Sequence, residues 1–305
     1  MDIRDLLAFG EPAHDEPPFG RRRNTLFEEL AGQGVRSIAL ETDRVAGLIV
    51  DDFVQDGVGT LDEVLKEGFS HSFGTLEPNR ELVAWMREYN NGRPAEERLA
   101  FHGFDASTEM MSAPSPRTYL EHTRDYLGLD LDIAGLAGDD ERWSRGEAVL
   151  DPAVSVGDTA EAHRLRALAD DLLTELHLRA PELIAATSRA AWFRAKTHVT
   201  AGLGLLRYHR ESAQPGDQRT RMCRQCGTRD VIMAQNLLDI REVEAGRGAT
   251  MVFAHNSHLQ LDISTWRSPM VDFEWWSAGA IVASLVGDRY SFAAGRLEDG
   301  EVAFG

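Results

Sequence analysis

Four apolar segments of the sequence end in side chains that could carry out acid–base chemistry. These side chains are Glu11 with His14 in "GEPAH", Glu41 with Asp43 in "ALETD", His102 with Asp105 in "FHGFD", and His255 with Asn256 and His258 in "AHNSH". An imidazole titrates near neutral pH and can take a proton from water, and a carboxylate can orient the ring. The four groups therefore favour general acid–base activation of a water molecule. Two or three histidines with a carboxylate would also suit zinc or iron, and spacing alone does not separate these interpretations.

Each of these residues also has a structural explanation when it is taken alone. Glu11 or Glu41 could cap a following helix. His14 lies in a proline-rich loop and could be a solvated turn residue, whereas His255 could donate to a neighbouring carbonyl in the core. We expect His102, inside its segment, to pack between a sheet and a helix. The functional interpretation depends on four such groups occurring at four segment ends.

The motifs of several common enzyme classes are absent from the sequence. It contains no GxSxG of the α/β-hydrolase nucleophile, no GxGxxG, no Walker A sequence and no HExxH. Serine-nucleophile, dinucleotide-binding, P-loop and zinc-protease sites are therefore unsupported. Acid–base catalysis without an evident nucleophile is the chemistry that the sequence favours.

The segments that carry these residues have the pattern of buried parallel strands. They are the apolar runs 5–11, 36–41, 98–105, 249–255 and 289–295. Helical patterns separate the early runs, at 21–34 and at 79–92, where Asn79 is expected to be the helix N-cap. Strands that alternate with helices predict an α/β fold with a largely parallel sheet flanked by helices. In such sheets ligands bind at the carboxyl ends of the strands, where all four polar groups lie.

The middle of the chain has a different pattern, with little strand signal. Leucines at helical spacing mark a helix within 158–181, Pro181 interrupts the pattern, and further helical sequence follows. We therefore predict a helical insertion at 108–210, between two parts of the α/β core at 1–107 and 211–305.

Composition and cysteine usage limit the partners of the protein. The net charge of −18 disfavours binding to nucleic acid and to anionic membranes. The first residues lack a basic and then apolar signal region, and the run "GAIVASLVG" is too short to span a bilayer. We expect a cytoplasmic protein with a small-molecule substrate. Cys223 and Cys226 form a lone CxxC without a second pair for zinc, which we interpret as two reduced thiols in a loop, a redox pair being the alternative.

Five motifs, in order along most of the chain, resemble the erythromycin esterase family. They are "FGEPAHDEPPFGRRRN", "IALETD", "AWMREYNNGRPAEERLAFHGFD", "RDVIMAQNL" and "VFAHNSHL". The first is similar to the family's GE-x-x-H motif with its arginine-bearing helix, and the last to its strand ending in Ala-His-Asn-x-His. The resemblance implies an α/β core interrupted by a helical region. It also implies activity on esters, since the family includes esterases that open macrolide lactones.

The resemblance implies roles for individual residues as well. The implied catalytic set is His14, Glu11, Glu41, His255 and His258, and we expect substrate to be bound by Arg23, Asp105 and Asn256. In this scheme His14 is the general base for an attacking water, and a glutamate orients its ring. Arg23 or a second histidine would stabilise the oxyanion as it forms.

We therefore predict a hydrolase that cleaves an ester or lactone of a small molecule in antibiotic or secondary metabolism. One alternative is a non-hydrolytic biosynthetic enzyme that uses the same histidine–glutamate cleft for cyclisation, elimination or group transfer. Another is a binding protein without activity. Hydrolysis needs a water beside His14, whereas the first alternative needs a dry pocket. We predict no cofactor and no metal, because the positive charge of Arg23 in the cleft would oppose a divalent cation, although a metal held by the histidines and glutamates is the alternative.

Overall fold

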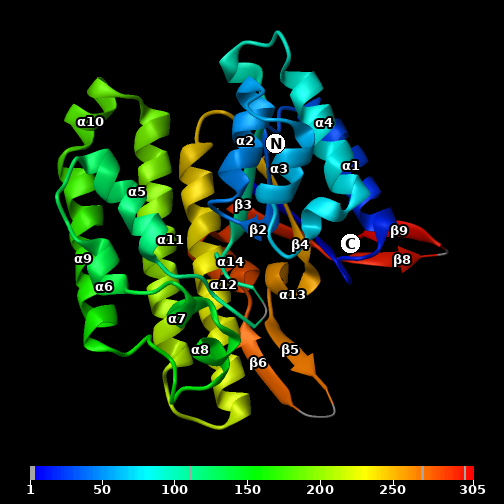
Figure 1. Cartoon of the computed structure of the whole chain (residues 1–305). Coiled ribbons are helices and arrows are strands. Elements are labelled where there is room, and N and C mark those ends of the chain that lie inside the picture. Colours follow the sequence, from blue (N-terminus) through cyan, green and yellow to red (C-terminus); the bar gives the residue numbers. More distant parts are fainter. Residues whose placement is uncertain (1–3, 110, 269–270, 299) are drawn as a thin grey trace. The chain divides into compact units, whose positions relative to one another are not determined.

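A five-stranded parallel sheet forms the centre of one part of the chain (Figure 1). The computed structural model describes residues 4–109, 111–268, 271–298 and 300–305. The strands are β1 (Leu6–Glu11), β2 (Ser37–Asp43), β3 (Ala100–Asp105), β4 (Thr250–His255) and β7 (Tyr290–Ala293). Their order across the sheet is β3-β2-β4-β1-β7, and each adjacent pair is parallel. The five apolar runs predicted as strands and the parallel α/β fold are thus confirmed.

Helices cover both faces of this sheet. On one face lie α1 (Pro17–Ala31), α2 (Gly47–Asp56), α3 (Leu61–Glu67) and α4 (Glu77–Asn90), and on the other lie α14 (Ala278–Val286) and the C-terminal part of α12 (Gln218–Val243). Successive residues of β4 alternate between the two cores, since Met251 and Phe253 join the first and Val252 and Ala254 the second. Burial on both faces explains why the strands read as continuous apolar runs.

The chain divides into two compact units. The first comprises Met1–Asp105 with Asp230–Gly305, and the second comprises Ala106–Arg229. The predicted insertion at 108–210 lies inside the second unit. That unit extends further along the chain because it includes the first part of α12, a helix that continues into the first unit.

The second unit is helical and has a hydrophobic core of its own. Its helices before α12 are α5 (Arg117–Leu127), α6 (Ile133–Ala137), α7 (Glu141–Ser144), α8 (Gly146–Leu150), α9 (Ala160–Leu178), α10 (Ala180–Ala186) and α11 (Arg189–Ser212). Leu165, Leu172 and Leu176 of α9 are buried in this core, as their helical spacing predicts. Pro181 occupies the second position of α10, where its missing N–H is tolerated.

Smaller elements complete the first unit. They are α13 (Asn256–Leu259), the hairpin of β5 (Ile263–Arg267) with β6 (Asp272–Trp276), the hairpin of β8 (Gly295–Glu298) with β9 (Glu301–Phe304), and the short 3-10 helices η1 (Phe73–Thr75), η2 (Ala95–Glu97) and η3 (Gly287–Arg289). No helix in the described ranges is both long enough and apolar enough to cross a membrane.

Two local predictions are wrong. Asn79 lies inside α4 and is not its N-cap, because the helix begins at Glu77 and Pro78 suits its first turn. Cys223 and Cys226 lie in helix α12 and not in a loop. The residues around them are mainly arginine and glutamine, which favour helix, and no proline interrupts them.

Candidate active site

Three adjacent strands of the sheet bring five of the predicted residues together. Glu11 is the last residue of β1, Glu41 lies near the end of β2, and His255 ends β4. His258 follows in α13, and His14 lies in the loop after β1. Strands β1 and β4 are in register, with Glu11 opposite His255. The strand order β2-β4-β1 therefore gathers these side chains at one edge of the sheet, at the carboxyl ends of its strands.

The ring of His14 lies close to both glutamates and is partly exposed. Its Nδ1 lies 2.9 Å from Glu11 Oε1, and its Nε2 lies 3.7 Å from Glu41 Oε2. Burial disfavours the charged ring, but the hydrogen bond to Glu11 and the charge of Glu41 outweigh it, so the pKa of His14 is raised. Because the Glu11 carboxylate accepts the Nδ1 proton, Nε2 carries the lone pair when the ring is neutral.

Glu41 lies between two imidazoles and is held by the backbone of a neighbouring strand. Its Oε2 accepts the backbone N–H of His255 at 2.8 Å, and its Oε1 lies 3.5 Å from His258 Nε2. The side chain is buried, with 5% of its surface exposed. The carboxylate is therefore fixed in place before any ligand arrives.

His258 is held by Asp230, a residue that the sequence analysis missed. His258 Nδ1 lies 3.0 Å from both carboxylate oxygens of Asp230. These oxygens also accept the indole N–H of Trp275 at 3.0 Å and the backbone N–H of Ala278 at 2.8 Å. Asp230 begins the apolar stripe of α12 and is fully buried. The position of this carboxylate on the apolar face of a helix could have identified it from the sequence, since buried acids are rare unless they are paired.

Both ring nitrogens of His255 have partners nearby. Nε2 lies 2.8 Å from the carbonyl oxygen of Pro12, and Nδ1 accepts the backbone N–H of Ser257. Because a carbonyl oxygen can only accept, Nε2 carries the proton. Burial lowers the pKa of His255 and outweighs the charge of Glu41, which acts in the opposite direction. The lowered pKa favours the neutral ring. The ring thereby joins the end of β4 to the loop that leads to His14.

Arg23 is a buried cation beside the same group. Its guanidinium donates to Asn24 Oδ1, to Asn79 Oδ1 at 2.8 Å and to the Pro78 carbonyl oxygen at 3.1 Å. It also lies over the ring of Phe253, 5.2 Å from the centroid. Burial lowers the pKa of Arg23 to about 10, with nearby Glu11 acting in the opposite direction, so the side chain remains charged at neutral pH.

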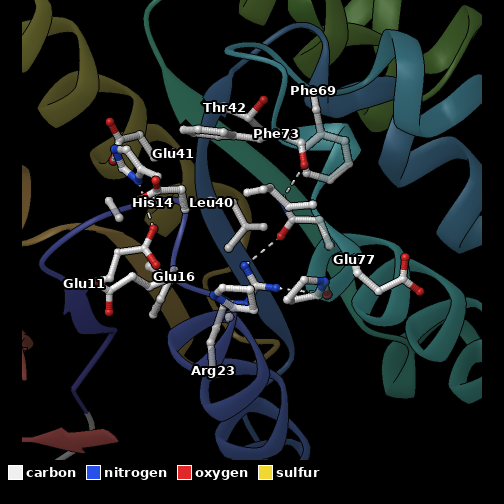
Figure 2. A pocket seen from close by; sticks show the side chains of 18 of the residues that line it. Glu11, His14, Glu16, Arg23, Leu40, Glu41, Thr42, Phe69, Phe73 and Glu77 are labelled. Carbon is white, nitrogen blue, oxygen red and sulfur yellow. Dashed lines mark hydrogen bonds and ion pairs between the residues drawn. The ribbon is translucent and has the colours of Figure 1, made fainter. Parts of the chain in front are cut away.

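A pocket of ≈ 280 Å³ opens beside these residues in the first unit. Its polar lining includes Glu11, His14, Arg23, Glu41, Thr42 and Asn79, and its apolar lining includes Leu40, Phe69, Phe73, Leu76 and Phe253. Figure 2 shows the side chains of Glu11, His14 and Glu41 grouped together, with Arg23 reaching the pocket from α1. The Phe73 ring lies 4.9 Å from the His14 ring, between centroids. The lining of this partly apolar cavity therefore includes the linked group of His14, Glu11 and Glu41 together with Arg23, and further charged residues lie around it, namely Asp15, Glu16, Arg21 and Glu77.

Two of the residues expected to bind substrate have other contacts. The side-chain amide of Asn256 donates to the Gly295 carbonyl at 3.1 Å and accepts the Gly295 N–H at 3.2 Å. Asp105 is fully buried at the end of β3, and its Oδ2 lies 3.8 Å from Nε2 of His71. Neither residue is part of the pocket lining. Asn79, expected only as a cap, instead positions Arg23 there.

Within the ranges that the structure describes, no group of three or more histidine, cysteine, aspartate or glutamate side chains could hold a metal ion.

The fold and the site together define an α/β protein with a histidine–carboxylate pocket at the carboxyl edge of its sheet. The sequence profile of the erythromycin esterase family matches residues 30–305, and the chain belongs to this family. The matched range includes Glu41, His255 and His258, and it begins after His14 and Arg23. A comparison with curated proteins found no match.

Solved structures share the fold at low sequence identity. A protein from Bacillus cereus is 17% identical with a TM-score of 0.68, over 98% of this chain and 69% of that one. A succinoglycan biosynthesis protein is 15% identical with a TM-score of 0.64, over 99% and 70%. A mutant of erythromycin esterase EreC in its open conformation is 17% identical with a TM-score of 0.65, over 95% and 69%. At these identities the likeness establishes the fold.

Proposed function

We propose that this protein is a hydrolase that cleaves an ester or lactone of a small molecule, with His14 as the general base. The observation that carries the proposal is the state of the His14 ring. Glu11 holds its Nδ1, whereas its Nε2 lies 3.7 Å from Glu41 Oε2 and makes no hydrogen bond with any residue in the described ranges, and the residue lines the pocket. A neutral imidazole in this state can take a proton from a water molecule.

The reaction would begin when His14 Nε2 takes a proton from water and the water oxygen attacks the substrate carbonyl. Glu11 and Glu41 would then face an imidazolium and stabilise its charge. Among the described residues, oxygens accept four of the five N–H groups of Arg23, which leaves one on Nη1 for the oxyanion. The proton on His14 would finally pass to the leaving alkoxide, so the products are an acid and an alcohol.

The remaining residues would position this group. His255 fixes the loop that carries His14 through the Pro12 carbonyl, and His258 supports Glu41 with Asp230 behind it. The pocket volume of ≈ 280 Å³ suits a small acyl group or one end of a larger molecule. We propose no cofactor and no metal in this reaction.

The test is hydrolysis in ¹⁸O-labelled water. The purified protein would be assayed with p-nitrophenyl esters of short acids and with macrocyclic lactones, and the acid product analysed by mass spectrometry. We expect one labelled oxygen in the acid, since the bond from water forms at the carbonyl carbon. A product without label, or an unsaturated product, would contradict hydrolysis and favour the non-hydrolytic alternative on the same site.

The matched control is His163→Ala. This histidine lies on the surface of the second unit, with 53% of its side chain exposed, and pairs with Asp158. The control variant should hydrolyse the same substrates at the wild-type rate.

A further inference from the structure

The only two cysteines of the chain lie one helical turn apart, and the proposed reaction does not use them. Cys223 and Cys226 are half-buried thiols of α12 that are not joined by a disulfide. Residues three apart in an α-helix share a face, with Cα atoms about 5 Å apart. This separation lies within the range that a disulfide can span. Two thiols supply only half of the four ligands of a structural zinc site, so redox chemistry is the better use of the pair.

The segment around the pair is basic, although the chain as a whole carries a net charge of −18. Residues 218–229 contain four arginines and no acidic residue. Arg221 donates to the carbonyl oxygens of Val149 and Leu150, which holds this part of the helix within the second unit. A local excess of positive charge draws small anions to the thiols. Glutathione disulfide, a small disulfide with several carboxylates, is such an anion.

We propose that Cys223 and Cys226 form a redox-active dithiol that exchanges with a small anionic disulfide of the glutathione class. The thiolate of one cysteine attacks the disulfide, forms a mixed disulfide and releases one thiolate. The other cysteine then attacks the protein sulfur of that mixed disulfide and releases the second. One disulfide bond is broken in the reagent and one forms in the protein. The two protons of the protein thiols end on the two reduced reagent molecules.

The helix makes this disulfide reversible. Cβ atoms three residues apart on a helix are about 5–6 Å from each other, whereas a disulfide holds them about 3.8 Å apart. Oxidation must therefore draw the two side chains together and distort one turn of α12. Strained disulfides are easily reduced, which suits a site that responds to redox conditions.

The distorted turn lies next to a residue of the candidate site. Asp230 follows Cys226 by four residues, one turn further along the same helix, and accepts hydrogen bonds from His258 and Trp275. Oxidation should therefore loosen the support of His258. An effect on turnover rests on the proposed function, whereas disulfide formation and the loosening of Asp230 do not.

The experiment equilibrates the full-length protein with reduced and oxidised glutathione at several ratios, without oxygen. After acid quenching and alkylation, intact-mass and peptide mass spectrometry count the free thiols. We expect wild type to lose both thiols together and to yield a peptide linked between Cys223 and Cys226. The Cys223→Ser and Cys226→Ser variants should instead stop at one glutathione adduct. Two thiols retained at the most oxidising ratio, stable glutathione adducts on wild type, or dimers linked between chains would each overturn the proposal.

Hydrogen–deuterium exchange tests the link to Asp230. We expect faster exchange for amides 227–234 in the oxidised protein than in the reduced protein, with reversal by reductant. The oxidant-treated double variant Cys223→Ser/Cys226→Ser, which has no thiol to modify, is the control and should match its own untreated form. Unchanged exchange in a protein whose disulfide has formed would overturn the link. Neither measurement needs a substrate, so failure of the proposed hydrolysis would leave both results interpretable.

Discussion

Two histidine–glutamate pairs in the first unit share nearly the same distance and differ in their surroundings. His14 Nδ1 lies 2.9 Å from Glu11 Oε1, and His102 Nε2 lies 2.8 Å from Glu244 Oε1. The His14 side chain is 32% exposed and borders a pocket, whereas that of His102 is 8% exposed. Both pairs join histidine to glutamate, so the residue types alone do not distinguish them.

The difference lies in how many partners each pair already has. Arg44 lies 3.2 Å from Nδ1 of His102, and Arg247 donates to both oxygens of Glu244. Burial opposes ionisation of Glu244, but His102 and the arginines outweigh it, so the pKa of Glu244 is lowered. Through these contacts Glu244, the residue after α12, is linked to His102 of β3. In the pair at the pocket, Nε2 of His14 makes no hydrogen bond to any described residue, and the proposed function rests on this difference.

The largest effect is expected from His14→Ala. Loss of a general base should lower kcat/KM by about 10²–10⁴-fold. The thermal midpoint should change little, because the partly exposed ring lies in a loop and contributes little packing. Steady-state kinetics on the best substrate and a thermal melt measure the two effects. Turnover near the wild-type level would remove His14 from the proposed role.

The second effect concerns stability and comes from Glu244→Gln. The amide keeps the volume but removes the buried negative charge that pairs with His102 and Arg247, so the free energy of unfolding should fall by about 3–5 kcal/mol. Since the pKa of Glu244 is lower in the folded state, its contribution is present above the unfolded pKa and is lost as pH falls through the folded pKa. Denaturant unfolding at several pH values measures this, and the difference between variant and wild type should shrink in acid. If the variant were as stable as wild type but impaired in turnover, the His102–Glu244 pair would have a functional role and not a structural one.

A smaller effect is expected from Glu11→Gln. The neutral amide can still accept the Nδ1 proton but no longer favours the imidazolium, so the pKa of His14 should fall. The acid limb of the pH–rate profile should therefore move to lower pH. The rate on the plateau should fall by about tenfold, because a charge-assisted hydrogen bond becomes a neutral one. An acid limb at the wild-type pH would show that another group titrates.

The smallest effect is expected from His255→Ala. This change removes the ring that donates to the Pro12 carbonyl, at a cost of about 1 kcal/mol in unfolding free energy. The shape of the pH–rate profile should stay the same, because His255 is neutral and positions the loop. A changed profile would make His255 an acid or base in its own right.

Much of the first unit could be predicted from sequence because its strands are buried on both faces. Continuous apolar runs marked the five strands, and the polar residues that end them marked the edge where Glu11, Glu41 and His255 meet. The partners that distinguish one cluster from another could not be predicted. Asn256 ends the same strand as His255 but binds the backbone of Gly295, and Asp230 reaches His258 across 28 residues. Such pairings depend on which segments lie side by side, which a local pattern does not record.

The position of β4 between β1 and β2 has a consequence for how the molecule is made. During synthesis, β1 and β2 emerge early but are not neighbours in the sheet, and the strand that joins them is the fourth along the chain. The hydrogen bond from the backbone N–H of His255 to the side-chain carboxylate of Glu41 joins residues 214 positions apart. It can therefore form only after the whole helical unit has been synthesised. Contacts of such long range slow folding, and unpaired strand edges are exposed to aggregation until they close. The pocket is therefore assembled late in folding, and a chain that stalls within the helical unit already contains His14, Glu11 and Glu41 without the strand that holds them together.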